Sequence, residues 1–175
     1  MSRKGAETES SQHRGNARRH PPVSRVASES ETHRIGDRPD EKKGTTLIVV
    51  DTNVVAYLLL PGEQAADAEY LYERDSDWAV PWVWRSEFRS VVTALMRRRV
   101  LSFDQACSLQ KRAELLLHGA EHNVDSDDVL TLARDSRCSA YDCEFVALAL
   151  QLETKLVTGD RQVLRAFPGV ALSLT

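Results

Sequence analysis

From residue 47 onward, short apolar segments alternate with longer segments of helical periodicity. Short apolar runs that end at turn or polar residues are typical of strands buried on both faces of a sheet. Because a helical pattern lies between each strand and the next, the sequence favours a parallel sheet with helices on both faces, an α/β fold. We expect five strands, at residues 47–50, 78–80, 122–124, 155–158 and 170–174.

Local signals support the boundaries of several helices. Pro61 and Gly62 end the first helix, and Ser102 with Gln105 three residues later has the capping-box pattern. Either Asp125 or Ser126 is expected to cap a later helix. The expected helices cover residues 54–60, 63–74, 83–99, 102–117, 127–136, 141–152 and 160–166.

Residues 1–45 differ from the rest of the chain in composition. They are rich in Ser, Arg, Glu and His and contain few large apolar side chains, so they cannot bury enough surface to offset their ordering entropy. We predict a disordered polar extension here and one folded domain at residues 46–175. The extension has ten basic and seven acidic residues, whereas the domain has thirteen basic and nineteen acidic residues, a net charge of −6. The sequence leaves open whether the extension is an RNA-binding arm or the product of a misassigned start codon.

The sequence lacks signals for a membrane or for secretion. It has no apolar stretch of about 18 residues and no apolar segment near its N-terminus. Its three cysteines, Cys107, Cys138 and Cys143, have no framework spacing and are expected to be free thiols. A cytoplasmic protein is therefore predicted.

Four acidic residues occupy positions where other side chains would be the default. Asp51 and Asp160 each follow an expected strand, and the carboxyl ends of parallel strands share one edge of a sheet. Glu87 lies among the apolar positions of its helix, and Asp142 precedes the apolar stripe of another. Glu144 falls off that stripe and is expected to face water.

Each acid by itself has an ordinary structural interpretation. Asp51 and Asp160 are suited to cap helices, Asp142 to a first helical turn, and Glu87 to an ion pair with Arg85 or Arg89. Together they would repel one another unless a cation neutralised them. A site with only carboxylate ligands favours a hard divalent ion, Mg²⁺ or Mn²⁺, which often serves phosphate-ester chemistry.

These positions resemble the motifs of the PIN-domain nucleases, and more narrowly those of VapC-like toxins of type II toxin–antitoxin systems. The matching segments are VVDTNVVAYLL, WRSEFRSVV, YDCEFVALAL and VTGDRQVL, which extend over about residues 46–175. The resemblance implies a three-layer α/β/α sandwich on a parallel sheet. It also implies Mg²⁺-dependent endoribonuclease activity.

The resemblance assigns roles to individual residues. It implies that Asp51 and Asp142 bind the metal directly, and that Glu87 and Asp160 complete the catalytic site directly or through water. Asn53 and Thr158 would hold the carboxylates in place. The family further implies an RNA substrate, a cognate antitoxin protein and a homodimer. Family members usually begin almost at the first strand, so the 45-residue extension is a departure.

Substrate contacts are less defined by the sequence. Arg97, Arg98 and Arg99 form the densest basic run of the domain, which either binds phosphate or only complements a helix C-terminus. Trp82 and Trp84 either stack on bases or pack in the core.

Two other function classes remain open at this stage. A haloacid-dehalogenase-like phosphatase also has an Asp after its first strand but needs a second Asp two residues later, where this chain has Asn53. A non-catalytic Mg²⁺-binding or RNA-binding module is the other class. A receiver-like module lacks a buried acid in a middle helix, so Glu87 argues against it.

Overall fold

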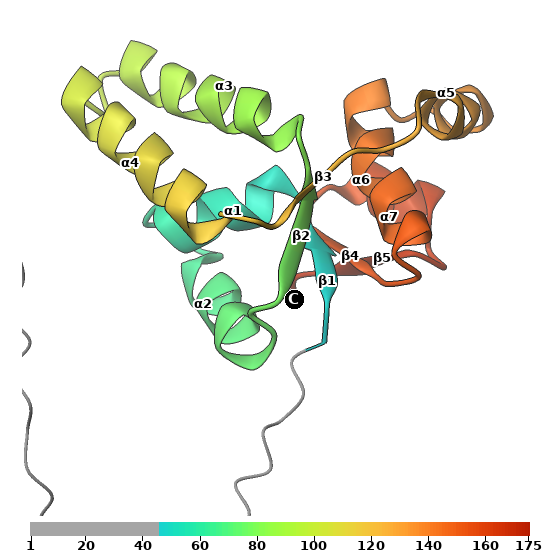
Figure 1. Ribbon diagram of the computed structural model, residues 1–175. Coiled ribbons are helices and arrows are strands. Elements are labelled where there is room, and N and C mark those ends of the chain that lie inside the picture. The colour runs from blue at the N-terminus through green and yellow to red at the C-terminus, as the bar shows by residue number, and fades with distance from the viewer. Residues whose placement is uncertain (1–45) are drawn as a thin grey trace, which may run out of the picture. The chain divides into compact units, whose positions relative to one another are not determined.

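The computed structural model describes residues 46–175, which fold around a five-stranded sheet (Figure 1). All strands are parallel, in the order β3-β2-β1-β4-β5. The predicted parallel sheet is therefore confirmed. The predicted disordered extension lies outside the described residues. The strands are β1 (Ile48–Val50), β2 (Trp78–Pro81), β3 (Glu121–His122), β4 (Leu156–Thr158) and β5 (Ala171–Ser173).

Helices cover both faces of the sheet, as Figure 1 shows. The helices α1 to α4 lie on one side, and α5 to α7 lie on the other. This separation follows from right-handed crossovers, because the chain moves from β1 towards β3 and then reverses towards β5. The result is the expected three-layer α/β/α sandwich. The helices are α1 (Thr52–Leu59), α2 (Ala65–Arg74), α3 (Trp84–Arg97), α4 (Phe103–Leu116), α5 (Ser126–Asp135), α6 (Ala140–Gln151) and α7 (Arg161–Ala166).

The apolar core anchors the elements that reach the carboxyl edge of the sheet. Every residue of β1, β2 and β4 is buried. Residues 145–149 of α6 are also buried, and this helix packs against β1 and β2. In α3, Trp84 and Phe88 are fully buried with their rings edge to face, 6.2 Å apart. Their burial fixes the first turns of α3, from which Glu87 projects.

The order in which the chain adds strands to the sheet reverses between β1 and β4. These strands are neighbours, with Val49 opposite Leu156 and Val50 opposite Val157. From β1 the chain continues to one side of the sheet, and from β4 it continues to the other. In open α/β sheets a ligand crevice forms at such a switch point, outside the carboxyl ends of the strands. The residues that follow β1 and β4 therefore lie at the crevice.

Some local predictions differ from the structure. Helix α1 begins at Thr52, earlier than expected, because Asp51 caps it. Helix α3 ends at Arg97, two residues early, and Arg99 has a φ of 60°, in the left-handed region that ends helices. Glu144 is half-buried instead of fully exposed, and burial raises its pKa. No helix within residues 46–175 is long and apolar enough to cross a membrane.

Candidate active site

Asp51 stands at the switch point, directly after β1, and is the N-cap of α1. Its Oδ1 accepts a hydrogen bond from the Asn53 backbone N–H at 3.3 Å. Its Oδ2 accepts two further hydrogen bonds, from the Thr158 hydroxyl at 2.5 Å and from Asn53 Nδ2 at 2.7 Å. The capping interpretation and the site interpretation of Asp51 are therefore compatible, because capping leaves the carboxylate at the edge of the sheet.

Asn53 and Thr158 tie the ends of β1 and β4 together. Asn53 Oδ1 accepts a hydrogen bond from the Gly159 backbone N–H at 3.0 Å. The Thr158 hydroxyl, fully buried, also accepts from the Asp160 backbone N–H at 2.9 Å. One hydroxyl thus contacts Asp51 and the backbone of Asp160, so the two acids are held at a fixed relative position.

Glu87 reaches the same edge from the first turn of α3. Thr52 Oγ1 donates a hydrogen bond to Glu87 Oε2 at 2.6 Å, and the Thr52 side chain is itself buried. The sequence analysis gave Thr52 no role. Its position between two polar residues after a buried strand was the available signal, but its partner lies 35 residues away and depends on how α3 packs on α1.

Helix caps orient the other two acids. Asp142 is in a capping box with Ser139: its Oδ2 accepts from the Ser139 backbone N–H at 2.9 Å and from the Ser139 hydroxyl at 2.8 Å. Asp160 caps α7 through Oδ1, which accepts from the Gln162 and Val163 backbone N–H groups. In both residues the second carboxylate oxygen has no hydrogen bond within the described part of the chain.

The electrostatics of this edge oppose full ionisation. Burial raises the pKa of Asp51, hydrogen bonds from Thr158 and Asn53 act against that shift, and the charges of Asp142 and Asp160 add to it. Burial also raises the pKa of Glu87, to about 7; the hydrogen bond from Thr52 opposes this, and nearby negative charges reinforce it. Asp142 and Asp160 are thus close enough to Asp51 to disfavour its charged form, and Asp51 and Asp142 act on Glu87 in the same way.

A cavity of about 470 Å³ opens at this edge. Asp51 and Glu87 line it, together with Thr52, Asn53, Val83, Ser86, Ser90, Val91 and Tyr141. Asp142 and Asp160 are not among the lining residues, and their influence on Asp51 is electrostatic. The structure therefore brings two of the four acids into one cavity and places the other two beside it.

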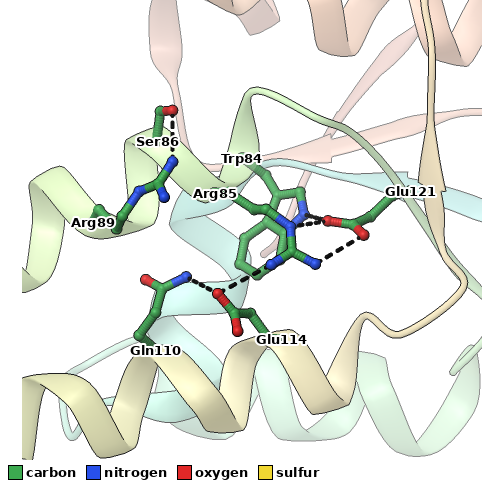
Figure 2. Close-up of polar contacts among 7 residues, drawn as sticks. All are labelled: Trp84, Arg85, Ser86, Arg89, Gln110, Glu114 and Glu121. Carbon is green, nitrogen blue, oxygen red and sulfur yellow. Dashed lines mark hydrogen bonds and ion pairs between the residues drawn. The ribbon is translucent and has the colours of Figure 1, made fainter. Parts of the chain in front are cut away.

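The expected ion pairs of Glu87 are not formed. Figure 2 shows that Arg85 turns instead to Glu121 and Glu114, and that Arg89 donates to Ser86. Across residues 46–175, none of the four acids takes part in an ion pair. Their charge is left without a cationic side chain to balance it.

The donor set is suited to a hard cation, with a restriction on the number of direct ligands. Among the described residues, no three His, Cys, Asp or Glu side chains are arranged so that they could hold an ion together. In proteins Mg²⁺ is usually held by one or two carboxylates, and water completes its coordination shell. Among these residues, a hard cation would therefore have at most two direct carboxylate ligands, with water completing its coordination shell.

Close packing at Gly159 restricts the loop that follows β4. A Cβ atom at this position would lie 3.0 Å from the Tyr57 hydroxyl and 3.4 Å from Asn53 Oδ1. The Gly-Asp sequence after β4 thus allows the backbone to approach Asn53, which accepts the hydrogen bond from Gly159.

The other predicted contact residues lie apart from the acids. Arg97, Arg98 and Arg99 are exposed at the end of α3. Ten residues separate Arg97 from Glu87, about 15 Å along the helix. Trp84 is buried in the core, whereas Trp82 is 49% exposed.

The chain is similar to known proteins in sequence and in structure. Over 126 residues it is 28% identical to Ribonuclease VapC3 of Pyrobaculum aerophilum. The aligned region covers 70% of this chain and 96% of that relative. The crystal structure of PAE2754 from Pyrobaculum aerophilum has a TM-score of 0.60 at 18% identity, with 74% of this chain and 85% of that one covered. FitAcB from Neisseria gonorrhoeae has a TM-score of 0.54 at 20% identity, with 73% and 97% covered.

The two solved structures establish a shared fold. The sequence match defines the family, because residues 48–169 match the PIN domain, a range that begins with β1 and extends past β4 and α7. It includes all four acids and the residues that orient them. The chain therefore belongs to the PIN domain family.

Proposed function

We propose that this protein is a divalent-metal-dependent endoribonuclease that hydrolyses RNA phosphodiester bonds, and that it is the toxin of a toxin–antitoxin pair. The observation that carries the proposal is that Asp51 and Glu87 share one cavity, with the charges of Asp142 and Asp160 close enough to act on Asp51. None of these four acids has a cationic partner in the described chain. The relative named Ribonuclease VapC3, which matches over 96% of its own length, supports the same activity.

In this proposal Asp51 and Asp142 bind Mg²⁺ or Mn²⁺ directly, and Glu87 and Asp160 act directly or through water. Such an ion lowers the pKa of a bound water and neutralises charge on the phosphate. Two direct carboxylates agree with the absence of any closer group of three acids among residues 46–175.

The remaining side chains keep the acids in position. Thr158 and Asn53 donate hydrogen bonds to Asp51 Oδ2, and Ser139 donates to Asp142 Oδ2. In each residue these side chains leave the Oδ1 atom without a hydrogen bond from them. Thr52 orients Glu87. Because these donors are already placed before substrate binds, little reorganisation is needed during the reaction.

The resemblance to VapC toxins extends the proposal to partners and location. A cognate antitoxin protein would block the acidic cavity, two copies of the chain would form a homodimer, and the protein would act in the cytoplasm. Arg97, Arg98 and Arg99 would contact RNA phosphates at a distance from the reaction. Residues 1–45 would form a polar extension, and residues 46–175 would form the nuclease domain.

The decisive experiment compares Asp51→Asn and Asp142→Asn with the unaltered protein in an RNA cleavage assay containing Mg²⁺. Both substitutions should reduce cleavage at least 100-fold while the protein remains folded, because each removes a charge that the ion requires. Asp104→Asn, an exposed acid in the first turn of α4, is the matched control and should cleave normally. Cleavage that persists in both site variants after rigorous purification would refute the assignment.

The phosphatase alternative finds little support in the site. The residue at the position of the required second acid, Asn53, uses its amide to donate to Asp51 and to accept from Gly159, and it has no proton to transfer. Assay with a generic phosphate monoester separates the two functions, since the proposed nuclease should leave that ester intact.

A further inference from the structure

A second cavity, of about 370 Å³, opens beside the acidic one at the carboxyl edge of the sheet. Its walls come from the residues that follow β2 and β3 and from two helices on the same side of the sheet, α5 and α6. Its volume falls in the range of small-molecule sites, about 300–1,000 Å³. The lining residues are Trp82, His122, Asn123, Val124, Ser126, Val129, Leu130 and Glu144.

Trp82 gives this cavity an exposed aromatic surface. It is 49% exposed, whereas Trp78 and Trp84 are 4% and 0% exposed. The Arg85 guanidinium lies over the Trp82 ring, 5.6 Å from its centroid. Arg85 is itself held by both oxygens of Glu121 and by Glu114, as Figure 2 shows. The indole is therefore ordered in advance, which lowers the entropic cost of stacking a planar ligand on it.

The cavity also has hydrogen-bonding groups in its lining. Glu144 lines the cavity from α6, is half-buried, and forms no ion pair within residues 46–175. A carboxylate can accept two parallel N–H donors. Among the RNA bases, guanine presents two adjacent donors of this kind on its Watson–Crick edge, the imino N1–H and the amino N2–H. Asn123 adds both a donor and an acceptor.

The two cavities are adjacent. Trp82 lines one and the next residue, Val83, lines the other. On α6, Tyr141 lines the acidic cavity and Glu144, three residues later, lines the second. A nucleotide whose phosphate is in the acidic cavity thus has its own base, or a neighbouring one, within reach of Trp82. Sequence-specific RNA recognition commonly combines aromatic stacking with hydrogen bonds to the base edge.

We propose that this second cavity binds one guanine base of the RNA substrate, stacked on Trp82 and hydrogen-bonded through N1–H and N2–H to the Glu144 carboxylate. The inference rests on the proposed nuclease function and adds to it a residue-level source of sequence preference. Trp82 and Glu144 are here specificity-determining residues, and they take no part in the hydrolysis.

The test measures binding without cleavage, in the full chain carrying Asp51→Asn. Because Trp82 is the exposed tryptophan among three, its fluorescence should report stacking in the cavity. Titration with GMP should quench the emission in a saturable manner, at lower concentrations than UMP, AMP or CMP. Trp82→Phe should abolish the signal change, and Glu144→Gln should remove the preference for GMP. Equal quenching by all four nucleotides, or none, would overturn the proposal.

A second readout uses short RNAs of identical length with or without guanosine, followed by fluorescence anisotropy. Trp82→Ala should weaken binding of the guanosine-containing RNA by about 5- to 150-fold, the range expected for loss of one stacked base. Tyr70→Ala removes another exposed aromatic ring, on α2, and should leave binding unchanged. Unchanged binding in Trp82→Ala would refute the base site, and this result is independent of whether Asp51 proves necessary for cleavage.

Discussion

Single side chains at the carboxyl edge show why a cap and an active-site acid can be the same residue. Asp51 and Asp160 cap helices through their Oδ1 atoms. Since one carboxylate oxygen suffices for capping, the other stays available for a hydrogen bond or a ligand. A role as helix cap and a role in the active site are therefore compatible for these acids.

Glu87→Gln should stabilise the protein at pH 8 in the absence of divalent ions. The pKa of Glu87 is raised from 4.5 to about 7, so the folded state binds this proton more tightly than the unfolded state. The free energy of unfolding consequently falls as the pH rises from about 4.5 to about 7, and Gln removes that loss. We expect a gain of about 1 kcal/mol at pH 8, after allowing for solvent screening.

Denaturant unfolding at pH 8 and at pH 4.5 measures the effect. At the lower pH Glu87 is already protonated when folded, so the gain should be small. Glu73→Gln, at an exposed position of α2, is the matched control and should show no such pH dependence. A gain of equal size at both pH values would contradict this explanation.

Thr158→Val should impair the site more than Thr158→Ser. Valine removes the hydroxyl that donates to Asp51 and accepts from the Asp160 backbone, so Asp51 loses one hydrogen bond and the partly buried Asp160 N–H loses its acceptor. A loss of about 1–3 kcal/mol in stability is expected. The pH at which cleavage is half-maximal should also rise, since the hydrogen bond from Thr158 lowers the pKa of Asp51. Serine keeps the hydroxyl and should retain the original pH profile.

At the scale of elements, the same capping motif appears at two helices with different surroundings. Ser102 with Gln105 caps α4, and Ser139 with Asp142 caps α6. Only the second places a proposed metal ligand in the capping box. Half of helix α6 is buried and the helix packs against β1 and β2, so its first turn is fixed relative to Asp51.

Ser139→Ala and Ser102→Ala should therefore destabilise the protein alike but differ in metal binding. Each loses one side-chain cap, which is expected to lower the free energy of unfolding by about 0.5–2 kcal/mol. Only Ser139→Ala should weaken Mg²⁺ binding, because Asp142 loses the hydroxyl that orients its carboxylate. Calorimetric titration with Mg²⁺ on both variants provides the comparison. Equal metal affinity would show that the cap does not position Asp142.

At the scale of the whole molecule, the described residues 46–175 form a five-stranded sheet with an apolar core. Within the residues that the structure describes, this core includes strands β1, β2 and β4 and much of α6. The sequence of residues 1–45 offers few large apolar side chains to add to it. The proposed division between a polar extension and a nuclease domain follows from this difference in composition.

A chain that begins at residue 46 should unfold with the same free energy as the full chain, within about 0.5 kcal/mol, because surface changes away from a core rarely exceed this. The denaturant m-value should also be unchanged, since it scales with the surface exposed on unfolding. Chemical denaturation of both proteins under matched conditions makes the comparison. A lower m-value in the shorter chain would show that residues 1–45 contribute folded structure.

Local sequence patterns predict much of this fold. Alternating apolar and helical segments predict all five strands and seven helices, because burial periodicity and turn residues act over a few neighbouring positions. Boundaries shift by one or two residues where a cap or a left-handed residue intervenes, as at Asp51 and Arg99. The parallel direction of the strands follows from the helical crossovers between them.

The sequence by itself determined which acids follow strands or occupy first helical turns. It did not determine their partners, because these depend on how distant elements pack. The Thr158 hydroxyl donates to Asp51, which lies 107 residues earlier in the sequence. Arg85 pairs with Glu121, 36 residues away in the sequence, and not with Glu87, which is closer in the sequence. Packing alone also decided that Trp84 is buried while Trp82 is exposed beside a cavity. Local periodicity sets the elements, whereas the fit between their surfaces sets the site.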